Sequence, residues 1–224
     1  MGKTVNAALQ LLALTLALGL PATRAAAMTF QLVTLGDGRC GVNCPRVISA
    51  QGEIGEETPD ALLGFLGDHL RRGGVRGIVL LDSPGGKVVA SMEFGQTLRR
   101  LGMAVIVARP TTETASTGDL AAGRCYSACV YALMGGRKRV IPPQSSIGVH
   151  RMFAYTSNFS LADLGMVRER NLDDGGMRAM LARYSRSMGV SVDLVNLAER
   201  TSPDQLHILT AAEIARWRLG SRKP

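Results

Sequence analysis

Two apolar segments joined by an amphipathic one constrain the fold of this chain most. Residues 46–54 have the composition of a buried strand, and residues 77–81 form a second, shorter apolar run. Between them, Thr58 and Pro59 are typical of a helix start, and residues 61–70 carry apolar side chains at helical spacing. A helix that crosses between two apolar strands is the unit of a parallel sheet. We therefore predict an α/β fold, and 224 residues suit a single domain with one substantial core.

The rest of the pattern continues this alternation of strands and helices. Further strands are predicted at residues 30–35, 103–108, 137–141 and 146–150. Further helices are predicted at residues 88–101, 161–188 with an interruption at 173–176, 192–200 and 209–219. Thr210 is the expected cap of the last helix.

Residues 1–27 have the order of a secretory signal peptide. A lone Lys3 precedes an apolar run at residues 7–20, and Pro21 and a group of alanines follow, so cleavage is predicted after Ala27. We therefore expect one folded domain over residues 28–224, located in the periplasm or secreted. The alternative is an uncleaved segment that anchors the chain in the inner membrane through residues 7–20.

The charge of the chain argues against nucleic acid as a partner but is compatible with attraction to anionic surfaces. The formal net charge is +8, and removal of residues 1–27 takes away Lys3 and Arg24 and no acidic residue, which leaves +6. The remaining arginines are scattered instead of forming one run. Nucleic acid is therefore not expected as a partner of this exported chain.

Four cysteines in an exported chain suggest disulfides. Cys40 and Cys44 lie in a glycine-rich loop that can bend back on itself, so we favour a bridge between them. Cys125 and Cys129 are one turn apart on a predicted helix, too far for an easy local bridge, so we expect them reduced and buried. Zinc is the other interpretation, but a metal on the second pair would occlude Ser127 between them.

Residues 82–86, Asp-Ser-Pro-Gly-Gly, directly follow the strand at 77–81. Gly85 and Gly86 permit backbone conformations and close approaches that a side chain would block, so their N–H groups can face a substrate. The carboxyl ends of strands are where open α/β folds bind ligands. The structural interpretation of the same residues is a plain tight turn.

The segment at residues 124–136 contains the nucleophile candidate. Small residues open it, an apolar run fills it and a glycine pair closes it, which predicts a short buried helix with Ser127 in its first turn. Backbone N–H groups at that position point outward and favour an oxyanion, so the amide of Ala128 joins those of Gly85 and Gly86 as a donor candidate. A capping serine between small core cysteines is the structural alternative.

Acyl transfer also needs a base that deprotonates the nucleophile. Histidine suits this role because its ordinary pKa is close to neutrality. His69 lies inside a predicted helix and His207 in a late loop, whereas His150 ends a strand shortly after the Ser127 segment. His150 is therefore the predicted base, although a lone strand-end histidine would equally suit a structural hydrogen bond.

In these motifs the sequence resembles the Clp protease proteolytic subunit and its relatives in the ClpP/crotonase superfamily. The resemblance runs from about residue 47 to about residue 219, and residues 82–86 are similar to the glycine loop that supplies the family's oxyanion hole. Ser127-Ala128 resembles the nucleophile segment, and residues 136–150 resemble the strand, proline and histidine segment that follows it. An exported branch of Clp-like proteins with a Cys-x-Ser-Ala-Cys segment is the most similar. The resemblance implies a spiral of parallel strands with flanking helices, and oligomers of identical chains are common in such proteins.

The resemblance also implies a third catalytic residue, an acid shortly before the last helix. Asp204 is the nearest acid, about two positions from the expected place, and Asp193, Asp173 and Asp174 are alternatives. A Ser/Lys dyad of the signal peptide peptidase kind would need a lysine instead of the histidine. Lys87, beside the glycine pair, is the lysine that could take that role.

Together these observations predict an exported, ATP-independent serine hydrolase that cleaves a peptide or protein substrate. His150 would take the proton from Ser127, and the Gly85, Gly86 and Ala128 amides would hold the oxyanion. No metal or cofactor is expected. Two alternatives keep the fold: a catalytically inactive binding or assembly protein, and a crotonase-like enzyme that acts on an acyl thioester.

Overall fold

The computed structural model describes residues 26–35, 44–70, 75–111, 120–160, 165–172 and 175–222. Most of the predicted signal segment lies outside these residues, as do Cys40, Asp173 and Asp174. Ala26, at the end of that segment, is attached to the folded body, because its carbonyl oxygen accepts a hydrogen bond of 2.7 Å from the Glu53 N–H.

Strands and helices alternate through most of the described ranges. The strands are β1 (Thr29–Thr34), β2 (Arg46–Gln51), β3 (Val75–Asp82), β4 (Ala104–Ile106), β5 (Ala108–Pro110), β6 (Leu120–Ala122), β7 (Arg124–Tyr126), β8 (Arg139–Val140), β9 (Ser146–Val149), β10 (Phe153–Ser160), β11 (Gly165–Leu172) and β12 (His207–Ile208). The helices are α1 (Thr58–Leu70), α2 (Val88–Arg100), α3 (Cys129–Met134), α4 (Gly176–Ser187), α5 (Asp193–Arg200) and α6 (Ala211–Arg216). Within the described ranges, none of these helices has the length and apolar character needed to cross a membrane.

The larger sheet is mainly parallel, with strand order β1-β2-β3-β4-β8. β1 runs antiparallel to β2, whereas β2, β3, β4 and β8 are parallel to one another. α1 crosses from β2 to β3 and α2 crosses from β3 to β4, as the apolar pattern predicts. The prediction of a single-domain α/β fold with parallel strands and flanking helices is confirmed.

A smaller sheet, of order β12-β9-β7, begins where β3 ends. β7 and β9 are parallel, and β12 is antiparallel to β9. Ser83, the residue after β3, forms a parallel bridge with Cys125 of β7. The carboxyl end of β3 is therefore joined directly to the second sheet, and the glycine loop lies at this junction.

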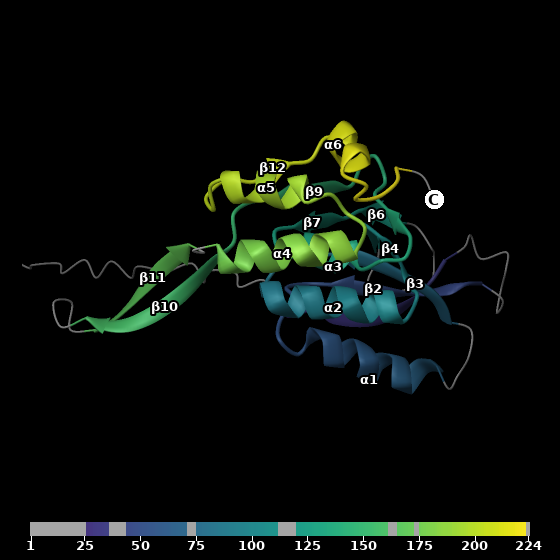
Figure 1. Cartoon of the computed structure of the whole chain (residues 1–224). Helices are drawn as coiled ribbons and strands as arrows, with labels where there is room; N and C mark the ends of the chain where they lie inside the picture. Colours follow the sequence, from purple (N-terminus) through teal and green to yellow (C-terminus); the bar gives the residue numbers. More distant parts are fainter. Residues whose placement is uncertain are drawn as a thin grey trace, which may run out of the picture.

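The helices stack on one side of the strands, with α1, α2 and α4 one above another (Figure 1). All residues of α3 are buried, and this helix packs against α2 at two glycines. A Cβ atom on Gly135 would lie 1.9 Å from the Gly95 carbonyl oxygen, so the two backbones touch. Tyr184 of α4 donates a hydrogen bond of 2.7 Å to the Tyr131 carbonyl oxygen of α3. The helix that follows Ser127 is therefore fixed from two sides.

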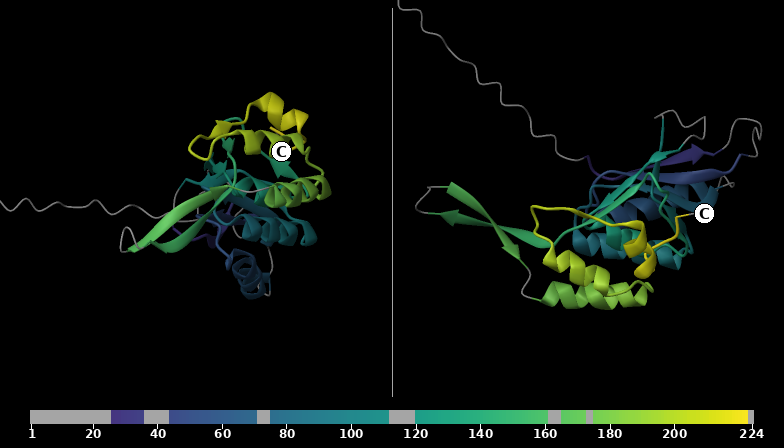
Figure 2. Two further views of the ribbon diagram at one scale, coloured as in Figure 1. Left: turned by 60° about the vertical axis from the view of Figure 1, so that its left-hand side comes forward. Right: turned by 90° about the horizontal axis from the view of Figure 1, so that it is seen from above.

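The prediction of a helix over residues 161–188 is wrong in its first part. β10 and β11 form an antiparallel hairpin from Phe153↔Leu172 to Ser160↔Gly165, and helix α4 begins only at Gly176. The hairpin extends away from the body of the molecule (Figures 1 and 2). Apolar residues at helical spacing favour a helix here, but eight cross-strand residue pairs form along the hairpin, so local strand pairing outweighs that spacing.

Candidate functional site

The junction of β3 with β7 places the glycine loop beside Ser127. The Ser83 N–H donates to the Arg124 carbonyl oxygen (2.7 Å), and the Tyr126 N–H donates to the Ser83 carbonyl oxygen (3.1 Å). A Cβ atom on Gly85 would lie 2.8 Å from the Ser127 Cβ and 3.2 Å from the Ala128 nitrogen. Two motifs about 40 positions apart in the sequence are therefore in direct contact.

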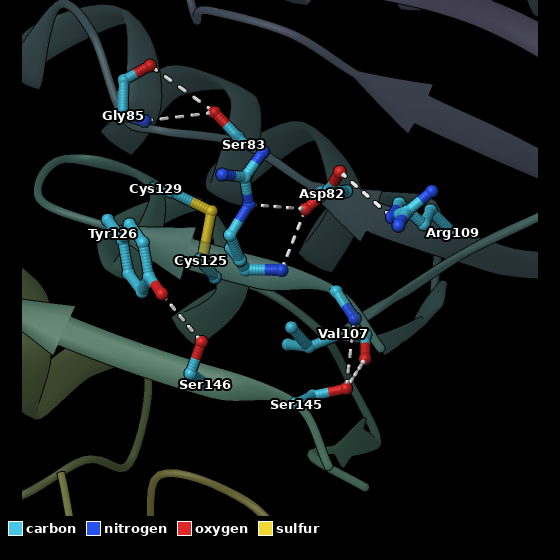
Figure 3. Close-up of polar contacts among 12 residues, drawn as sticks. Asp82, Ser83, Gly85, Val107, Arg109, Cys125, Tyr126, Cys129, Ser145 and Ser146 are labelled. Carbon is cyan, nitrogen blue, oxygen red and sulfur yellow. Dashed lines mark hydrogen bonds and ion pairs between the residues drawn. A yellow bond between two sulfur atoms is a disulfide. The ribbon is translucent and has the colours of Figure 1, made fainter. Parts of the chain in front are cut away.

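Asp82 locks this junction, a role that the sequence analysis did not give it. Its side chain is only 10% exposed, and its Oδ1 accepts a hydrogen bond of 2.7 Å from the Arg124 N–H. The guanidinium groups of Arg109 and Arg124 lie 4.0 Å and 3.8 Å from the carboxylate (Figure 3). The available signal was an acid at a strand end with arginines at later strand positions, here Arg109 of β5 and Arg124 of β7, because a buried carboxylate needs such partners.

Gly85 and Gly86 adopt backbone conformations that exclude most side chains, with φ values of 114° and 139°. The Gly85 N–H donates to the Ser83 Oγ (3.1 Å), so it is already used within the loop. The Gly86 and Ala128 amides have no acceptor among the described residues. The Gly86 and Ala128 amides are therefore available as donors, whereas the Gly85 amide is not, and the lack of a side chain at Gly85 permits its close contact with Ser127.

Ser127 lies in a turn and not in the first turn of a helix, so that part of the prediction is wrong. β7 occupies residues 124–126 because it pairs with β9, and α3 starts at Cys129. Ser127 has a φ of 55°, a left-handed conformation that is uncommon for a residue with a side chain. Its N–H donates to the Gly148 carbonyl oxygen at 2.8 Å. The side chain is half-buried, at the point where the strand turns into the helix.

Cys125 and Cys129 form a disulfide, so the prediction of two reduced cysteines is wrong. The reason is the same turn: Cys125 belongs to a strand, and the reversal at Ser127 brings the two Cα atoms to 5.3 Å. That separation lies within the range of protein disulfides. Cys44 is also a disulfide cysteine, and its predicted partner Cys40 lies outside the described residues.

His150 directly follows β9, the strand that pairs with β7. The Gly148 carbonyl that accepts the Ser127 N–H lies two positions before it, so the end of β9 passes beside the serine. The His150 Nδ1 lies 2.9 Å from the Arg151 carbonyl oxygen. Because a carbonyl oxygen only accepts, Nδ1 carries the proton, which leaves Nε2 as the acceptor in the neutral ring. In the described ranges no hydrogen bond joins this ring to the Ser127 hydroxyl.

Within the described ranges, neither Asp204 nor Asp193 forms a hydrogen bond or ion pair with the His150 imidazole, and both have other partners. Asp204 is 72% exposed and pairs with Arg170 of the hairpin, and the Asp193 carboxylate accepts from the Ser191 hydroxyl (3.0 Å) at the start of α5. In the described part of the chain, the hydrogen-bond partner of the His150 ring is the Arg151 main-chain carbonyl. Lys87 is 69% exposed and lies 3.9 Å from Glu56.

Another histidine, His207, lies on the neighbouring strand β12 and pairs with a glutamate. His207 of β12 is opposite Val149, and its Nε2 lies 3.0 Å from the Glu213 Oε1. The Glu213 side chain also accepts from the Thr210 N–H (2.7 Å) as part of the predicted helix cap. Burial raises the pKa of Glu213, but hydrogen bonds from Thr210 and His207 outweigh it and lower the pKa overall. In the described part of the chain, no three metal-ligating side chains come together.

Comparison with known proteins bears on the fold. No protein-family profile matches the chain, and no curated protein matches it either. The solved structures that match include two variants of the 1510-N membrane-bound stomatin-specific protease. A serine-to-alanine variant is 19% identical, with a TM-score of 0.52 over 78% of both chains. A lysine-to-alanine variant in complex with a substrate peptide is 20% identical, with a TM-score of 0.51 over 78% of this chain and 74% of that one. The fold is that of a ClpP-type peptidase.

Proposed function

We propose that this chain is an exported, ATP-independent serine peptidase that cleaves a peptide or protein substrate. The observation that carries the proposal is the close contact between the Gly85 backbone and the Ser127 turn, together with two amides, those of Gly86 and Ala128, that have no acceptor among the described residues. Free donors beside a nucleophile are what stabilises a tetrahedral oxyanion. The similarity to protease structures supports a peptide as substrate.

In the proposed reaction, the Ser127 Oγ attacks the substrate carbonyl carbon while the His150 Nε2 accepts the hydroxyl proton. The oxyanion receives hydrogen bonds from the Gly86 and Ala128 amides. The C–N bond then breaks, and the imidazolium returns the proton to the leaving amine. Water, deprotonated by the same ring, releases the acyl group. The Arg151 carbonyl favours the His150 tautomer that this reaction needs, with the proton on Nδ1 and Nε2 free to accept.

Two further parts of the proposal concern location and assembly. Residues 1–27 would direct the chain to an oxidising compartment, and the Cys125–Cys129 disulfide supports such a location. An oligomer of identical chains is proposed by resemblance alone.

The direct test is labelling with a fluorophosphonate, which forms an adduct with activated serines. Wild-type protein should be labelled at Ser127, whereas Ser127→Ala and His150→Ala should lose the adduct. Lys87→Ala is the matched control and should retain it. Loss of labelling in the lysine variant alone would replace the Ser/His mechanism with a Ser/Lys dyad.

A non-catalytic binding role is the second candidate, favoured by the lack of a described hydrogen bond between Ser127 and His150. Hydrogen bonds of this kind are often long in the absence of substrate, so the geometry does not exclude catalysis. If folded wild-type protein forms no adduct but binds a peptide that Ser127→Ala binds equally well, the binding role holds.

A further inference from the structure

The disulfide between Cys125 and Cys129 closes a short loop with Ser127 at its centre. Cys125 lies in β7 and Cys129 is the first residue of α3. If the chain continued as a strand from Cys125 to Cys129, the two Cα atoms would be roughly 13 Å apart. They are 5.3 Å apart, so the bridge spans the reversal that presents the serine.

The backbone at Ser127 needs such support. A left-handed residue with a side chain persists only where its surroundings hold it. Two described main-chain hydrogen bonds restrain it: the Ser127 N–H donates to the Gly148 carbonyl oxygen (2.8 Å), and the Ser127 carbonyl oxygen accepts from the Val130 N–H (3.2 Å). The disulfide adds a covalent restraint between the strand before the turn and the helix after it.

Burial decides what kind of restraint this is. Cys125 and Cys129 are both 0% exposed, and α3 is buried along its whole length. A reductant in solution therefore cannot reach the sulfur atoms without local opening of the fold. The bridge is a lasting clamp, made when the chain is oxidised, and not a rapidly exchanging switch.

We propose that the Cys125–Cys129 disulfide is a positioning device for Ser127, so that the chain becomes reactive only after this bridge forms. The two thiols lose two protons and two electrons to a disulfide-containing acceptor, which becomes a dithiol. Until then, the turn samples conformations in which the hydroxyl points away from the Gly86 and Ala128 amides. This inference rests on the proposed serine chemistry.

The test uses the full chain with Cys125→Ala and Cys129→Ala together, and the matched control is Cys40→Ala with Cys44→Ala. We expect the rate constant of fluorophosphonate labelling at Ser127 to fall by about tenfold to a hundredfold in the first variant, because small misplacements of a reacting group have effects of this size. The control should keep the wild-type rate. In a peptidase assay, kcat should fall while KM stays constant.

A second measurement separates this inference from the proposed function. Hydrogen exchange of the Ser127 amide should accelerate in the first variant, while amides of α1 keep their protection. Wild-type protein refolded under reducing conditions should show the same change, and reoxidation should restore it. Unchanged exchange at Ser127 would overturn the clamp even if labelling fell. Accelerated exchange without any labelling of wild-type protein would keep the clamp and reject the serine chemistry.

A separate cavity, of about 580 Å³, lies beside β8, an edge strand of the larger sheet. Its lining contains five cationic side chains and no acidic one: Arg137, Lys138, Arg139, Arg218 and Arg222. Arg137 and Lys138 directly precede β8, whereas the glycine loop follows the carboxyl end of the parallel strand β3. The cavity is therefore distinct from the Ser127 site.

Arg139, which lines this cavity, and the neighbouring Arg99 have no carboxylate partner in the described ranges. The Arg139 guanidinium donates to main-chain carbonyls, among them those of Leu219 (2.7 Å) and Arg218 (2.9 Å). Arg99 donates to the Met134 and Met188 carbonyls. Burial, followed by the charge of Arg99, lowers the pKa of Arg139. The carbonyls accept hydrogen bonds from both guanidinium groups, although the Arg99 Nε is buried without a partner, and they leave the net charge, which an anion would neutralise.

The geometry points to a binding site for a phosphate group, carried either by a small soluble molecule or by a lipid headgroup. Calorimetry with pyrophosphate and sedimentation with phosphatidylglycerol vesicles distinguish these sources. Arg137→Gln with Lys138→Gln should weaken whichever interaction occurs by about tenfold. Arg183→Gln with Arg186→Gln, two exposed arginines of α4, is the control and should leave it unchanged. Binding of neither probe, or equal loss in both variants, would overturn the site.

Discussion

The Ser127 turn and the β10–β11 hairpin are two reversals of the same chain with opposite surroundings. The turn is held by β9, by the glycine loop and by a disulfide, and α3 beyond it is completely buried. The hairpin strands pair with each other, and Met166 and Leu172 are 67% and 48% exposed. The comparison teaches that local backbone pairing is sufficient to form a reversal, whereas a reactive position needs support from distant segments.

The largest expected effect is the loss of the serine hydroxyl. Ser127→Ala should reduce peptide hydrolysis by at least about a thousandfold, because the nucleophile of an acyl transfer has no substitute. The unfolding free energy should change little, and thermal denaturation checks this. Equal hydrolysis by the variant and the wild type would remove the turn from the reaction.

Next in size is the contact that fixes α3. Gly135→Ala places a Cβ atom 1.9 Å from the Gly95 carbonyl oxygen, so α2 and α3 must separate. We expect a loss of about 3 kcal/mol in unfolding free energy, measured by urea denaturation. Gly102→Ala, where a Cβ atom meets nothing within 4 Å, is the control for a glycine whose main constraint is its φ of 67°. A smaller loss at position 135 than at 102 would contradict the close contact.

The sequence predicted the support of the turn only in part, for physical reasons. Residues 82–86, Ser127 and His150 are identifiable because each stands at a strand end or a strand-to-helix junction. The disulfide is not identifiable in this way. A regular helix would hold Cys125 and Cys129 too far apart for an easy bridge, whereas the left-handed turn at Ser127 brings them together. The hairpin is missed since its pairing is purely local, and the orienting carbonyl of Arg151 has no signature in a sequence.

Removal of the Asp82 charge tests the long-range support directly. Asp82→Asn keeps the size of the side chain but weakens the acceptor for the Arg124 N–H and removes both ion pairs. A loss of about 2 kcal/mol in unfolding free energy is expected, together with slower labelling of Ser127. Unchanged labelling and stability would show that the β3–β7 junction needs no carboxylate.

A smaller effect concerns pH. The pKa of Glu213 is lower in the folded chain than in the unfolded one, so its ionised form contributes stability above the ordinary carboxyl pKa. This contribution disappears as the pH falls through the folded-state pKa. Glu213→Gln should therefore flatten the acid side of the stability profile, measured by thermal unfolding between neutral and acidic pH. An unaltered profile would contradict the lowered pKa.

The smallest effect is expected in the hairpin. Asn171→Ala removes an exposed hydrogen bond of 2.7 Å to the Thr156 hydroxyl, and the unfolding free energy should change by no more than about 0.5 kcal/mol. The same variant should leave labelling of Ser127 at the wild-type rate. A large loss would mean that the hairpin supports the body of the molecule, and the contrast with the turn would disappear.

The Arg151 carbonyl that orients His150 cannot be deleted by any side-chain substitution, and it does not ionise in water. An enzyme built in this way would orient its base without a second ionisable side chain. Such an enzyme would also have one fewer position at which a single amino-acid substitution abolishes activity.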